Sequence, residues 1–457
     1  MSQRTISAFL TPDAKVHFVG IGGVSMAPLA EALRSTGVMV TGSDLNESPA
    51  TDALKNMGIT IKIGHLAEHI TGADAIIRTA AARDDNPEIK AAREAGIPVF
   101  ERAEAWGHIM QQYKNAICIA GTHGKTSTTS MCTHILLAAD TDPTVMIGGN
   151  LAKLQSGHRV GSGDTIVLES CEYYNSFHNF FPTIAVLLNV EEDHLDYFEN
   201  LEQIQESFRK FADLVPEDGA IVANGDDKKT MDALAPLGRE IWTFGFGENN
   251  RIRAENVSYQ DVGASFDLYV EGQLSCTVKL KVPGAHNVSN ALAAIGVAVV
   301  LGLEPAAICE GLSDFTGAGR RFEYKGEING AKVYDDYAHH PTELAVLLDA
   351  VEKLDFERTI LAFQPHTYTR TKALFDDFVR ELRRPERTYI AEIFAAREQN
   401  TVGISAKDVA EQVARAQHVP TLEEMAEKIR EIAKEGDIIL TVGAGDIFKV
   451  GEMLVQA

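Results

Sequence analysis

The chain has 457 residues, too many for one hydrophobic core, so we expect two or three domains. Its 65 acidic and 42 basic residues give a formal net charge of −23, which argues against a surface that binds nucleic acid. The five cysteines are scattered without metal-ligand spacing, and no apolar run is long enough to cross a membrane. We therefore expect a cytoplasmic enzyme with reduced cysteines that acts on small molecules, not on nucleic acid or at a membrane.

The N-terminus is predicted to open with a βαβ unit. The apolar run Lys15–Val19 predicts a buried strand that leads through a glycine-rich turn into a helix, and Met39–Gly42 predicts the next strand. Such a turn with an acid, Asp44, about two dozen residues later is similar to a dinucleotide-binding fingerprint. Ser25 replaces the third glycine of that fingerprint, so the pattern favours a nucleotide sugar or another phosphate ligand over nicotinamide or flavin.

A second glycine loop follows the apolar stretch Ala116–Ala120. Glycine N–H groups and a helix N-terminus bind phosphate oxygens, Lys125 can reach the outer phosphates, and Thr126 can coordinate Mg²⁺. Only two residues separate Gly121 from Gly124, so the loop is shorter than the common four-spacer form. A turn without a ligand is the alternative, but Gly-Lys-Thr directly after a buried strand favours a nucleoside triphosphate. The candidate ATP-binding residues here are Gly121, Thr122, His123, Gly124, Lys125, Thr126 and Ser127.

Two further apolar runs predict strands that end near this loop, Thr165–Glu169 and Ile184–Asn189. Ligands of parallel sheets bind at the carboxyl ends of the strands. Glu169 at such an end is costly to ionise without a cation, which suggests Mg²⁺. His194 follows the second strand, but the sequence leaves its role as a metal ligand open because Mg²⁺ prefers oxygen.

The remaining pattern predicts antiparallel hairpins over residues 251–282, an alanine-rich helix, and strand-then-helix units at residues 332–353, 358–382 and 437–455. We therefore predict an α/β protein of three domains. The predicted domains are an N-terminal Rossmann-like domain (1–111), a central ATP-binding domain with a P-loop-type, mostly parallel sheet (112–318), and a C-terminal Rossmann-like α/β domain (319–457).

In chain order, a series of motifs resembles the Mur ligase family, ATP-dependent enzymes that form amide bonds in peptidoglycan synthesis. The resemblance covers essentially the whole chain. The motifs are Gly20–Gly23, Gly121–Thr126, Glu169–Glu172, Asp193–Asp196, His286–Asn287, Asn290–Ala294, Gly319–Phe322, Asp335–Glu343, Phe363–His366 and Gly443–Ile447. Two departures stand out: Thr367 occupies a position where many relatives carry a basic residue, and Cys171 lies in a segment that is often more acidic in relatives.

The resemblance implies ligation of L-alanine to the lactyl carboxylate of UDP-N-acetylmuramate through an acyl phosphate, with ADP and phosphate as products. The implied cofactors are ATP and Mg²⁺, with Mn²⁺ able to replace it, and the partners are the small-molecule substrates of a monomer or homodimer. One alternative is a cell-wall recycling ligase that adds a preformed peptide to the same sugar, which Gly22, Gly23 and Tyr337 disfavour. A nicotinamide-dependent dehydrogenase would leave the Gly-Lys-Thr loop unexplained, and a non-catalytic nucleotide switch stays open.

The resemblance also implies roles for individual residues. The UDP-sugar residues are Gly20, Gly22, Gly23, Ser25 and Asp44, and the metal ligands are Thr126, Glu169 and His194. Nucleotide contacts come from Asn287, Asn290, Arg321 and Asp336, and amino-acid contacts from Tyr337, His339 and Arg370. The implied catalytic set is Lys125, Glu169, His194 and His339.

Overall fold

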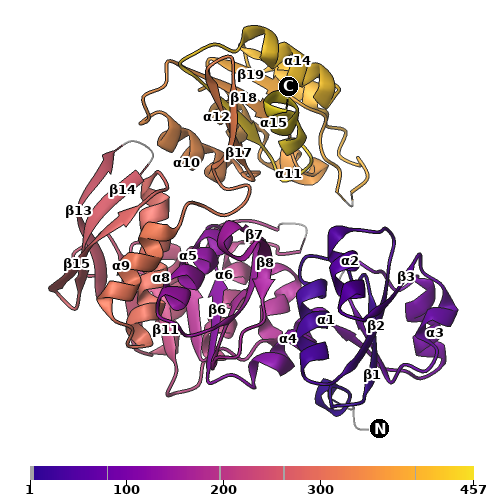
Figure 1. Ribbon diagram of the computed structural model, residues 1–457. Coiled ribbons are helices and arrows are strands. Elements are labelled where there is room, and N and C mark those ends of the chain that lie inside the picture. The colour runs from indigo at the N-terminus through magenta and orange to yellow at the C-terminus, as the bar shows by residue number, and fades with distance from the viewer. Residues whose placement is uncertain (1–4, 80, 195–196, 261–262, 397, 457) are drawn as a thin grey trace. The chain divides into compact units, whose positions relative to one another are not determined.

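The computed structural model describes residues 5–456 except 80, 195–196, 261–262 and 397 (Figure 1). Its internal contacts divide the chain into two compact units. The first unit comprises Met1–Arg253, Tyr269–Leu274 and Ala291–Gly311, and the second comprises Ala254–Leu268, Ser275–Asn290 and Leu312–Ala457. The described residues form three sheets of five, ten and six strands, each accompanied by helices, as expected for an α/β protein.

The N-terminal sheet has the strand order β3-β2-β1-β4-β5, and every neighbouring pair is parallel. Its strands are β1 (Lys15–Val19), β2 (Met39–Asp44), β3 (Thr60–Ile63), β4 (Ala75–Arg78) and β5 (Val99–Glu101). Its helices are α1 (Met26–Ser35), α2 (Pro49–Asn56), α3 (Pro87–Glu94) and α4 (Arg102–Met110), with short 3₁₀ turns η1 (Ile6–Ala8) and η2 (Ala67–Ile70). In Figure 1, α1 and α4 lie on one side of the strands and α3 on the other. The predicted βαβ opening is confirmed.

The central sheet has the order β15-β14-β13-β12-β11-β10-β6-β9-β7-β8. The neighbouring pairs from β7 to β13 are parallel, and β8 pairs antiparallel with β7. The strands are β6 (Asn115–Ala120), β7 (Thr144–Leu151), β8 (Ser156–Arg159), β9 (Thr165–Glu169), β10 (Ile184–Leu187), β11 (Ala220–Asn224), β12 (Ile241–Gly245), β13 (Ile252–Gln260), β14 (Gly263–Val270) and β15 (Gln273–Leu280). The helices are α5 (Lys125–Ala138), α6 (Leu201–Asp213), α7 (Lys228–Leu234), α8 (Ala285–Val300) and α9 (Pro305–Asp314), with 3₁₀ segments η3 (Ala152–Leu154), η4 (Tyr173–Asn179) and η5 (Ala235–Leu237). The mostly parallel central sheet predicted from the sequence is confirmed.

The C-terminal sheet has the order β16-β17-β21-β18-β19-β20, with β16 antiparallel to β17 and the other pairs parallel. Its strands are β16 (Glu323–Ile328), β17 (Ala331–Asp336), β18 (Arg358–Phe363), β19 (Arg387–Ile390), β20 (Ala416–His418) and β21 (Asp437–Val442). Its helices are α10 (Pro341–Val351), α11 (Tyr368–Ala373), α12 (Phe375–Leu382), α13 (Ala406–Glu411), α14 (Leu422–Ile432) and α15 (Phe448–Val455). The three predicted strand-then-helix units are present, and residues 387–432 add β19, β20, α13 and α14, which the sequence pattern had not indicated.

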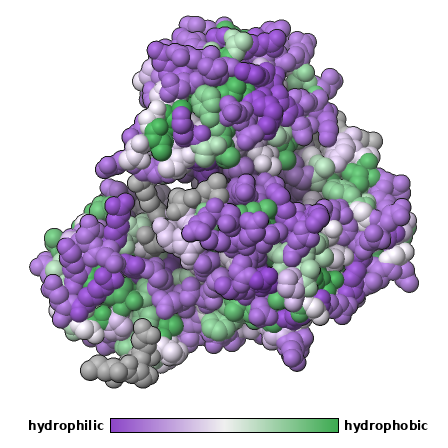
Figure 2. Space-filling model, turned by 180° about the vertical axis from the view of Figure 1, so that it is seen from behind, coloured by the Kyte–Doolittle hydropathy of each residue, from purple (hydrophilic) through white to green (hydrophobic). Residues whose placement is uncertain are grey.

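The face drawn in Figure 2 is mostly hydrophilic, with hydrophobic residues scattered among hydrophilic ones. Among the described helices, none combines the length and the apolar character needed to cross a membrane. All five cysteines are free, and Cys118 and Cys132 are buried.

Candidate active site

The N-terminal glycine loop joins β1 to α1 and is braced by the end of β2. The backbone N–H groups of Gly20 and Ile21 donate to the carbonyl oxygen of Ser43, both at 2.9 Å. The N–H of Gly22 donates to Oδ2 of Asp44 at 2.8 Å. The end of β2 therefore holds the loop through a backbone carbonyl group and through one carboxylate.

The other sugar-site candidates of this loop lie beside it. The N–H of Gly23 donates to the carbonyl oxygen of Gly20 at 3.2 Å, and Ser25 stands at the N-terminus of α1. The indole Nε1 of Trp106 on α4 donates to the carbonyl oxygen of Ser25 at 3.2 Å. The structure thus brings together all five residues that the sequence assigned to the sugar.

A buried carboxylate supports the same edge of this sheet. Glu88 on α3 is fully buried and accepts a hydrogen bond from Oγ of Ser43 at 2.6 Å. Nδ1 of His69 and Nδ1 of His65 lie 2.8 Å and 3.2 Å from its oxygens, and Nε2 of His17 lies at 3.8 Å. Burial alone would raise the pKa of Glu88, but the interaction with His17 and the hydrogen bonds from Ser43 and His69 outweigh it and lower the pKa to about 2. Sequence patterns did not reveal this cluster, because its members come from four separate segments.

The second glycine loop joins β6 to α5 and contains Lys125 as the first residue of the helix. Nζ of Lys125 donates to the carbonyl oxygens of Gly121 and Thr122, the latter at 3.1 Å, and to Oε2 of Glu172 at 3.2 Å. Burial lowers the pKa of Lys125, but the charges of Glu172 and Glu169 raise it by more. The pKa therefore lies above its ordinary value, and the ammonium group stays charged. A cation on a glycine loop at a helix N-terminus is suited to phosphate oxygens.

Residues after β10 hold the rest of this loop in place. The N–H of His123 donates to Oδ1 of Asn189 at 2.7 Å, and the N–H of Glu191 donates to Oγ1 of Thr122 at 2.9 Å. Gly124 takes the left-handed conformation, with φ of 86°, at the N-cap of α5, which favours glycine there. Ser127 is buried in the first turn of the helix.

Two of the three predicted metal ligands meet at the end of β9. Oγ1 of Thr126 donates to the two carboxylate oxygens of Glu169 at 3.1 Å and 3.0 Å. The N–H of Gly148 donates to Oε2 of the same carboxylate at 2.7 Å. A hydroxyl and a carboxylate side by side are the oxygen ligands that Mg²⁺ prefers, so these residues fit the predicted ion.

The third predicted ligand, His194, lies beside a different carboxylate. Its ring stacks on that of Tyr173 with centroids 4.3 Å apart, and its Nε2 lies 4.0 Å from Oε1 of Glu172. The described contacts of His194 do not include Glu169. Leu195 and Asp196 of the same motif lie outside the described residues.

Glu172 connects the lysine and the histidine, a role that the sequence did not assign. It is only 2% exposed, and its two oxygens face Lys125 and His194. The motif Glu169–Glu172 contained the residue, but only the structure shows which groups it contacts.

Of the nucleotide-binding candidates in the second unit, Arg321 lies close enough to Asp336 to interact with its charge. Asn287 and Asn290 lie one turn apart on α8, each 8% exposed, and Nδ2 of Asn287 donates to a backbone carbonyl at 2.7 Å. Asp336 accepts hydrogen bonds from the N–H groups of Phe322 and Ala338, both at 2.8 Å. Burial raises the pKa of Asp336 to about 6, although the charge of Arg321 opposes the shift.

The amino-acid candidates form a chain of side chains linked by His366. The rings of Tyr337 and His339 are 5.4 Å apart, and those of His339 and His366 are 5.7 Å apart. Nη1 of Arg370 lies 3.4 Å from Nδ1 of His366. The structure thus brings together Tyr337, His339 and Arg370. It adds His366, which belonged to a motif in the sequence analysis but was given no role there. Thr367, the departing residue, has φ of 65° and starts α11.

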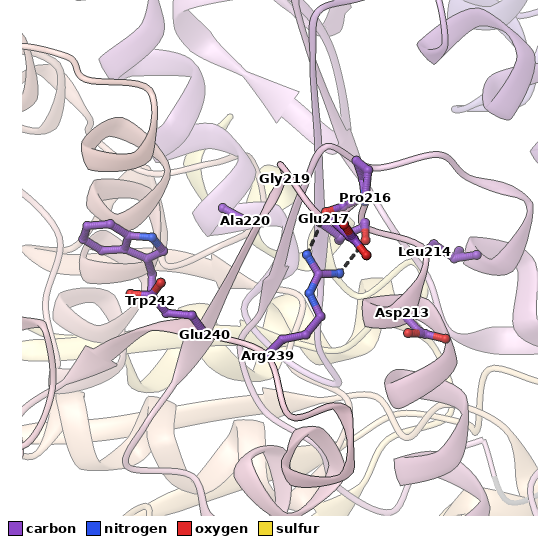
Figure 3. A pocket seen from close by; sticks show the side chains of 10 residues that line it. Asp213, Leu214, Pro216, Glu217, Gly219, Ala220, Arg239, Glu240 and Trp242 are labelled. Atoms are coloured by element: carbon purple, nitrogen blue, oxygen red, sulfur yellow. Dashed lines mark hydrogen bonds between the residues drawn. The ribbon is translucent and has the colours of Figure 1, made fainter.

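One described pocket lies away from these residues. It has a volume of about 630 Å³ and surrounds the amino ends of β11 and β12, including Ala220 and Trp242 (Figure 3). The phosphate loop follows the carboxyl end of β6, so it lies at the opposite edge of this parallel sheet. Arg239 in the pocket donates to the backbone carbonyl oxygens of Val215 and Pro216, so its guanidinium group already has acceptors.

Three family models match the chain. They are the Mur ligase family catalytic domain over residues 15–114, the Mur ligase middle domain over residues 119–298, and the Mur ligase glutamate ligase domain over residues 320–445. A UDP-N-acetylmuramate–L-alanine ligase of Agathobacter rectalis is 46% identical over 447 residues, which cover 96% of this chain and 97% of that protein.

Solved structures show the same likeness along the whole chain. The UDP-N-acetylmuramate–alanine ligase of Thermotoga maritima gives a TM-score of 0.81 at 30% identity, covering 97% of this chain and 98% of that one. A murein peptide ligase of Psychrobacter arcticus gives a TM-score of 0.71 at 26% identity, also covering 97% and 98%. This chain belongs to the Mur ligase family and has its three-domain α/β fold, which confirms the family and the fold class expected from the sequence.

Proposed function

We propose that this protein catalyses the ATP-dependent addition of L-alanine to UDP-N-acetylmuramate in peptidoglycan synthesis. The observation that carries the proposal is the group of Lys125, Thr126 and Glu169 at the carboxyl ends of β6 and β9. The whole-chain likeness to alanine-adding ligases supports the choice of substrates.

The reaction requires activation of a carboxylate, because an oxide ion is too poor a leaving group for an amine to displace it from an unactivated carboxylate. We propose that the lactyl carboxylate attacks the γ-phosphorus of ATP, which forms an acyl phosphate and releases ADP. The neutral amine of alanine then attacks the acyl carbon, and the tetrahedral intermediate collapses with loss of phosphate. Lys125 neutralises charge on the transferred phosphoryl group. His339, whose ring lies next to that of Tyr337, is the proposed catalytic residue of the second unit.

Mg²⁺ is the proposed metal, and Thr126 and Glu169 would hold it, with His194 as the proposed ligand of a second ion. When bound, it would offset the repulsion between the carboxylate and the γ-phosphate. Glu172 orients Lys125 through their 3.2 Å ion pair and is the charged neighbour of His194.

The remaining assignments follow the three domains, with proposed boundaries 1–111, 112–318 and 319–457. The N-terminal loop with Gly22 and Asp44 would bind the UDP-sugar, and its braced backbone supports that role. Asn287, Asn290, Arg321 and Asp336 would contact ATP, and Tyr337, His339 and Arg370 would bind alanine.

The recycling ligase that adds a preformed peptide is the second candidate. The murein peptide ligase is 26% identical to this chain, whereas the alanine ligase of Agathobacter rectalis is 46% identical. This difference favours the single amino acid. The decisive test measures phosphate release with ATP, Mg²⁺ and UDP-N-acetylmuramate against a panel of amino acids and the recycling tripeptide. We expect release with L-alanine, and release with the tripeptide alone would contradict the proposal.

An isotope experiment tests the acyl phosphate itself. With ¹⁸O in the carboxylate of the sugar, one labelled oxygen leaves with the phosphoryl group, so label should appear in the released phosphate. Label in AMP, or pyrophosphate among the products, would show activation by adenylylation instead.

A further inference from the structure

Arg102 lies at the edge of the N-terminal sheet that carries the glycine loop. It is the first residue of α4 and directly follows β5, which is parallel to the other strands, so it stands at their carboxyl ends. Residues four apart share a helix face, and one turn further along α4 Trp106 donates its indole N–H to the carbonyl oxygen of Ser25. Arg102 therefore occupies the helix face that contacts the glycine loop.

The same helix packs against the segment that follows the metal-site glutamate. A Cβ atom at Gly107 would collide with the carbonyl oxygen of Asn179 at the end of η4, so the two backbones approach closely there. The N–H of Phe181 donates to the sulfur of Met110 at 3.1 Å. Helix α4 is thus in contact with both the glycine loop and the segment after Glu169.

The electrostatic neighbours of Arg102 identify what it faces. Cys171 and Glu101 are the groups that interact electrostatically with Arg102, and Cys171 in turn interacts with the charges of Glu172, Lys125 and Glu169. Arg102 is therefore next to the catalytic acidic segment as well as the proposed sugar site.

The guanidinium group of Arg102 has no acceptor within the described part of the chain. No hydrogen bond or ion pair to it is formed by the described residues, although its side chain is half-buried. Glu101, its neighbour, is engaged instead by Nε of Arg78 at 2.6 Å. Burial lowers the pKa of Arg102, and the electrostatic interactions with Cys171 and Glu101 only partly oppose that shift. The other arginine of this edge, Arg78, is paired with two carboxylates, so Arg102 is prepared for an anion that comes from outside the chain.

We propose that Arg102 binds the carboxylate of the sugar substrate and brings it to the phosphate loop, an inference that rests on the proposed function. The carboxylate must enter a region that already holds Glu169 and Glu172, and a second cation beside Lys125 offsets that repulsion. A planar guanidinium group pairs with a carboxylate through two parallel hydrogen bonds, which also orients the attacking oxygen.

The test compares three ligands that differ in one group. Calorimetry measures binding of UDP, UDP-N-acetylglucosamine and UDP-N-acetylmuramate to the wild type, to Arg102→Ala and to Arg102→Lys. The first two ligands carry the diphosphate but no lactyl carboxylate. We expect Arg102→Ala to weaken UDP-N-acetylmuramate binding by about tenfold or more, the scale of a hydrogen-bonded charge pair, and to change the other two affinities less than twofold. Arg102→Lys keeps the charge without the two parallel bonds and should give an intermediate loss.

Controls separate this assignment from a loss of fold and from a failure of the proposed function. Arg93→Ala removes an exposed arginine of α3 and should leave all three affinities unchanged, and ATP affinity should be normal in every variant. An equal loss for all three ligands would move Arg102 to the diphosphate and overturn the assignment, as would unchanged UDP-N-acetylmuramate binding. A wild type that binds no UDP-N-acetylmuramate would overturn the proposed function as well.

Discussion

The first unit contains two glycine loops of the same local design that differ in the charge placed beside them. Both follow a parallel strand and open a helix, β1 to α1 in one case and β6 to α5 in the other. In the N-terminal loop, the carboxylate of Asp44 receives the N–H of Gly22 at 2.8 Å. In the central loop, Lys125 lies over the loop carbonyls and Thr126 contacts Glu169.

This difference shows that a glycine turn alone does not determine the ligand. A carboxylate at the first loop disfavours a dense anion and suits hydroxyl and amide groups, such as those of a nucleoside. A lysine and a hydroxyl at the second loop suit a polyphosphate with its metal. The five substitutions below each act on one of these loops or on a residue that supports it.

Lys125→Ala should have the largest effect, because it removes the cation of the central loop. We expect turnover to fall by at least about 10²-fold, the scale of a lost transition-state charge contact, with the fold intact. Phosphate release under saturating substrates measures the loss, and Lys229→Ala on α7, an exposed lysine, is the control. Near-normal release from a folded variant would contradict the role of this loop.

Glu88→Gln tests the buried support of the N-terminal loop. A carboxyl group whose pKa falls from 4.5 to about 2 on folding stabilises the fold above pH 4.5, and the contribution is lost as the pH falls through the folded value. The variant should therefore lose at most about 3 kcal/mol of unfolding free energy at pH 7, and less at pH 3. Urea unfolding at the two pH values measures this, with Glu94→Gln on the exposed face of α3 as control. A deficit that does not shrink at pH 3 would refute the ionised network.

Glu169→Gln should raise the Mg²⁺ concentration needed for half-maximal activity by about tenfold, because a neutral amide is a weaker ligand for Mg²⁺. His194→Ala should move the same titration in the same direction. The exposed Glu202→Gln on α6 serves as control. Unchanged magnesium titrations would show that neither residue is a metal ligand.

Asp44→Asn should have the smallest effect, since the amide oxygen can still accept the N–H of Gly22. We expect a loss of about 1 kcal/mol in UDP-sugar binding and no change in the KM for ATP. Asp74 is a matched control, because its carboxylate also accepts a backbone N–H. The donor is Lys15 at the amino end of β1, at 2.8 Å, whereas Gly22 follows the carboxyl end of β1. Equal losses in Asp44→Asn and Asp74→Asn would mean that only the sheet has been weakened.

Features carried by contiguous residues could be predicted from the sequence. The strands β1, β6 and β9 are continuous apolar runs, and the phosphate loop is a single motif, so local patterns were sufficient. The pairing of Thr126 with Glu169 could also be predicted, since both follow parallel strands whose carboxyl ends share one edge.

Features that depend on distant segments could not be predicted. Glu88 meets Ser43 and His17 across 45 and more residues, and neither periodicity nor a motif marks such a pair. The contacts of Glu172 and the position of Arg102 beside Cys171 also need the folded chain. In η4, Tyr174 and Asn175 take left-handed conformations, with φ of 54° and 53°, and Tyr174 is not a residue type that favours this conformation.

The contact between Gly107 and Asn179 joins helix α4 to the segment that follows Glu169. Because α4 touches the glycine loop through Trp106 and touches η4 at Gly107, it connects the loop that we propose binds the sugar with the segment that follows the proposed metal ligand Glu169. Transfer of a phosphoryl group requires accurate positioning of the attacking oxygen and the leaving oxygen. Under the proposed function, the absence of a side chain at position 107 would therefore help to keep the two reactants in register.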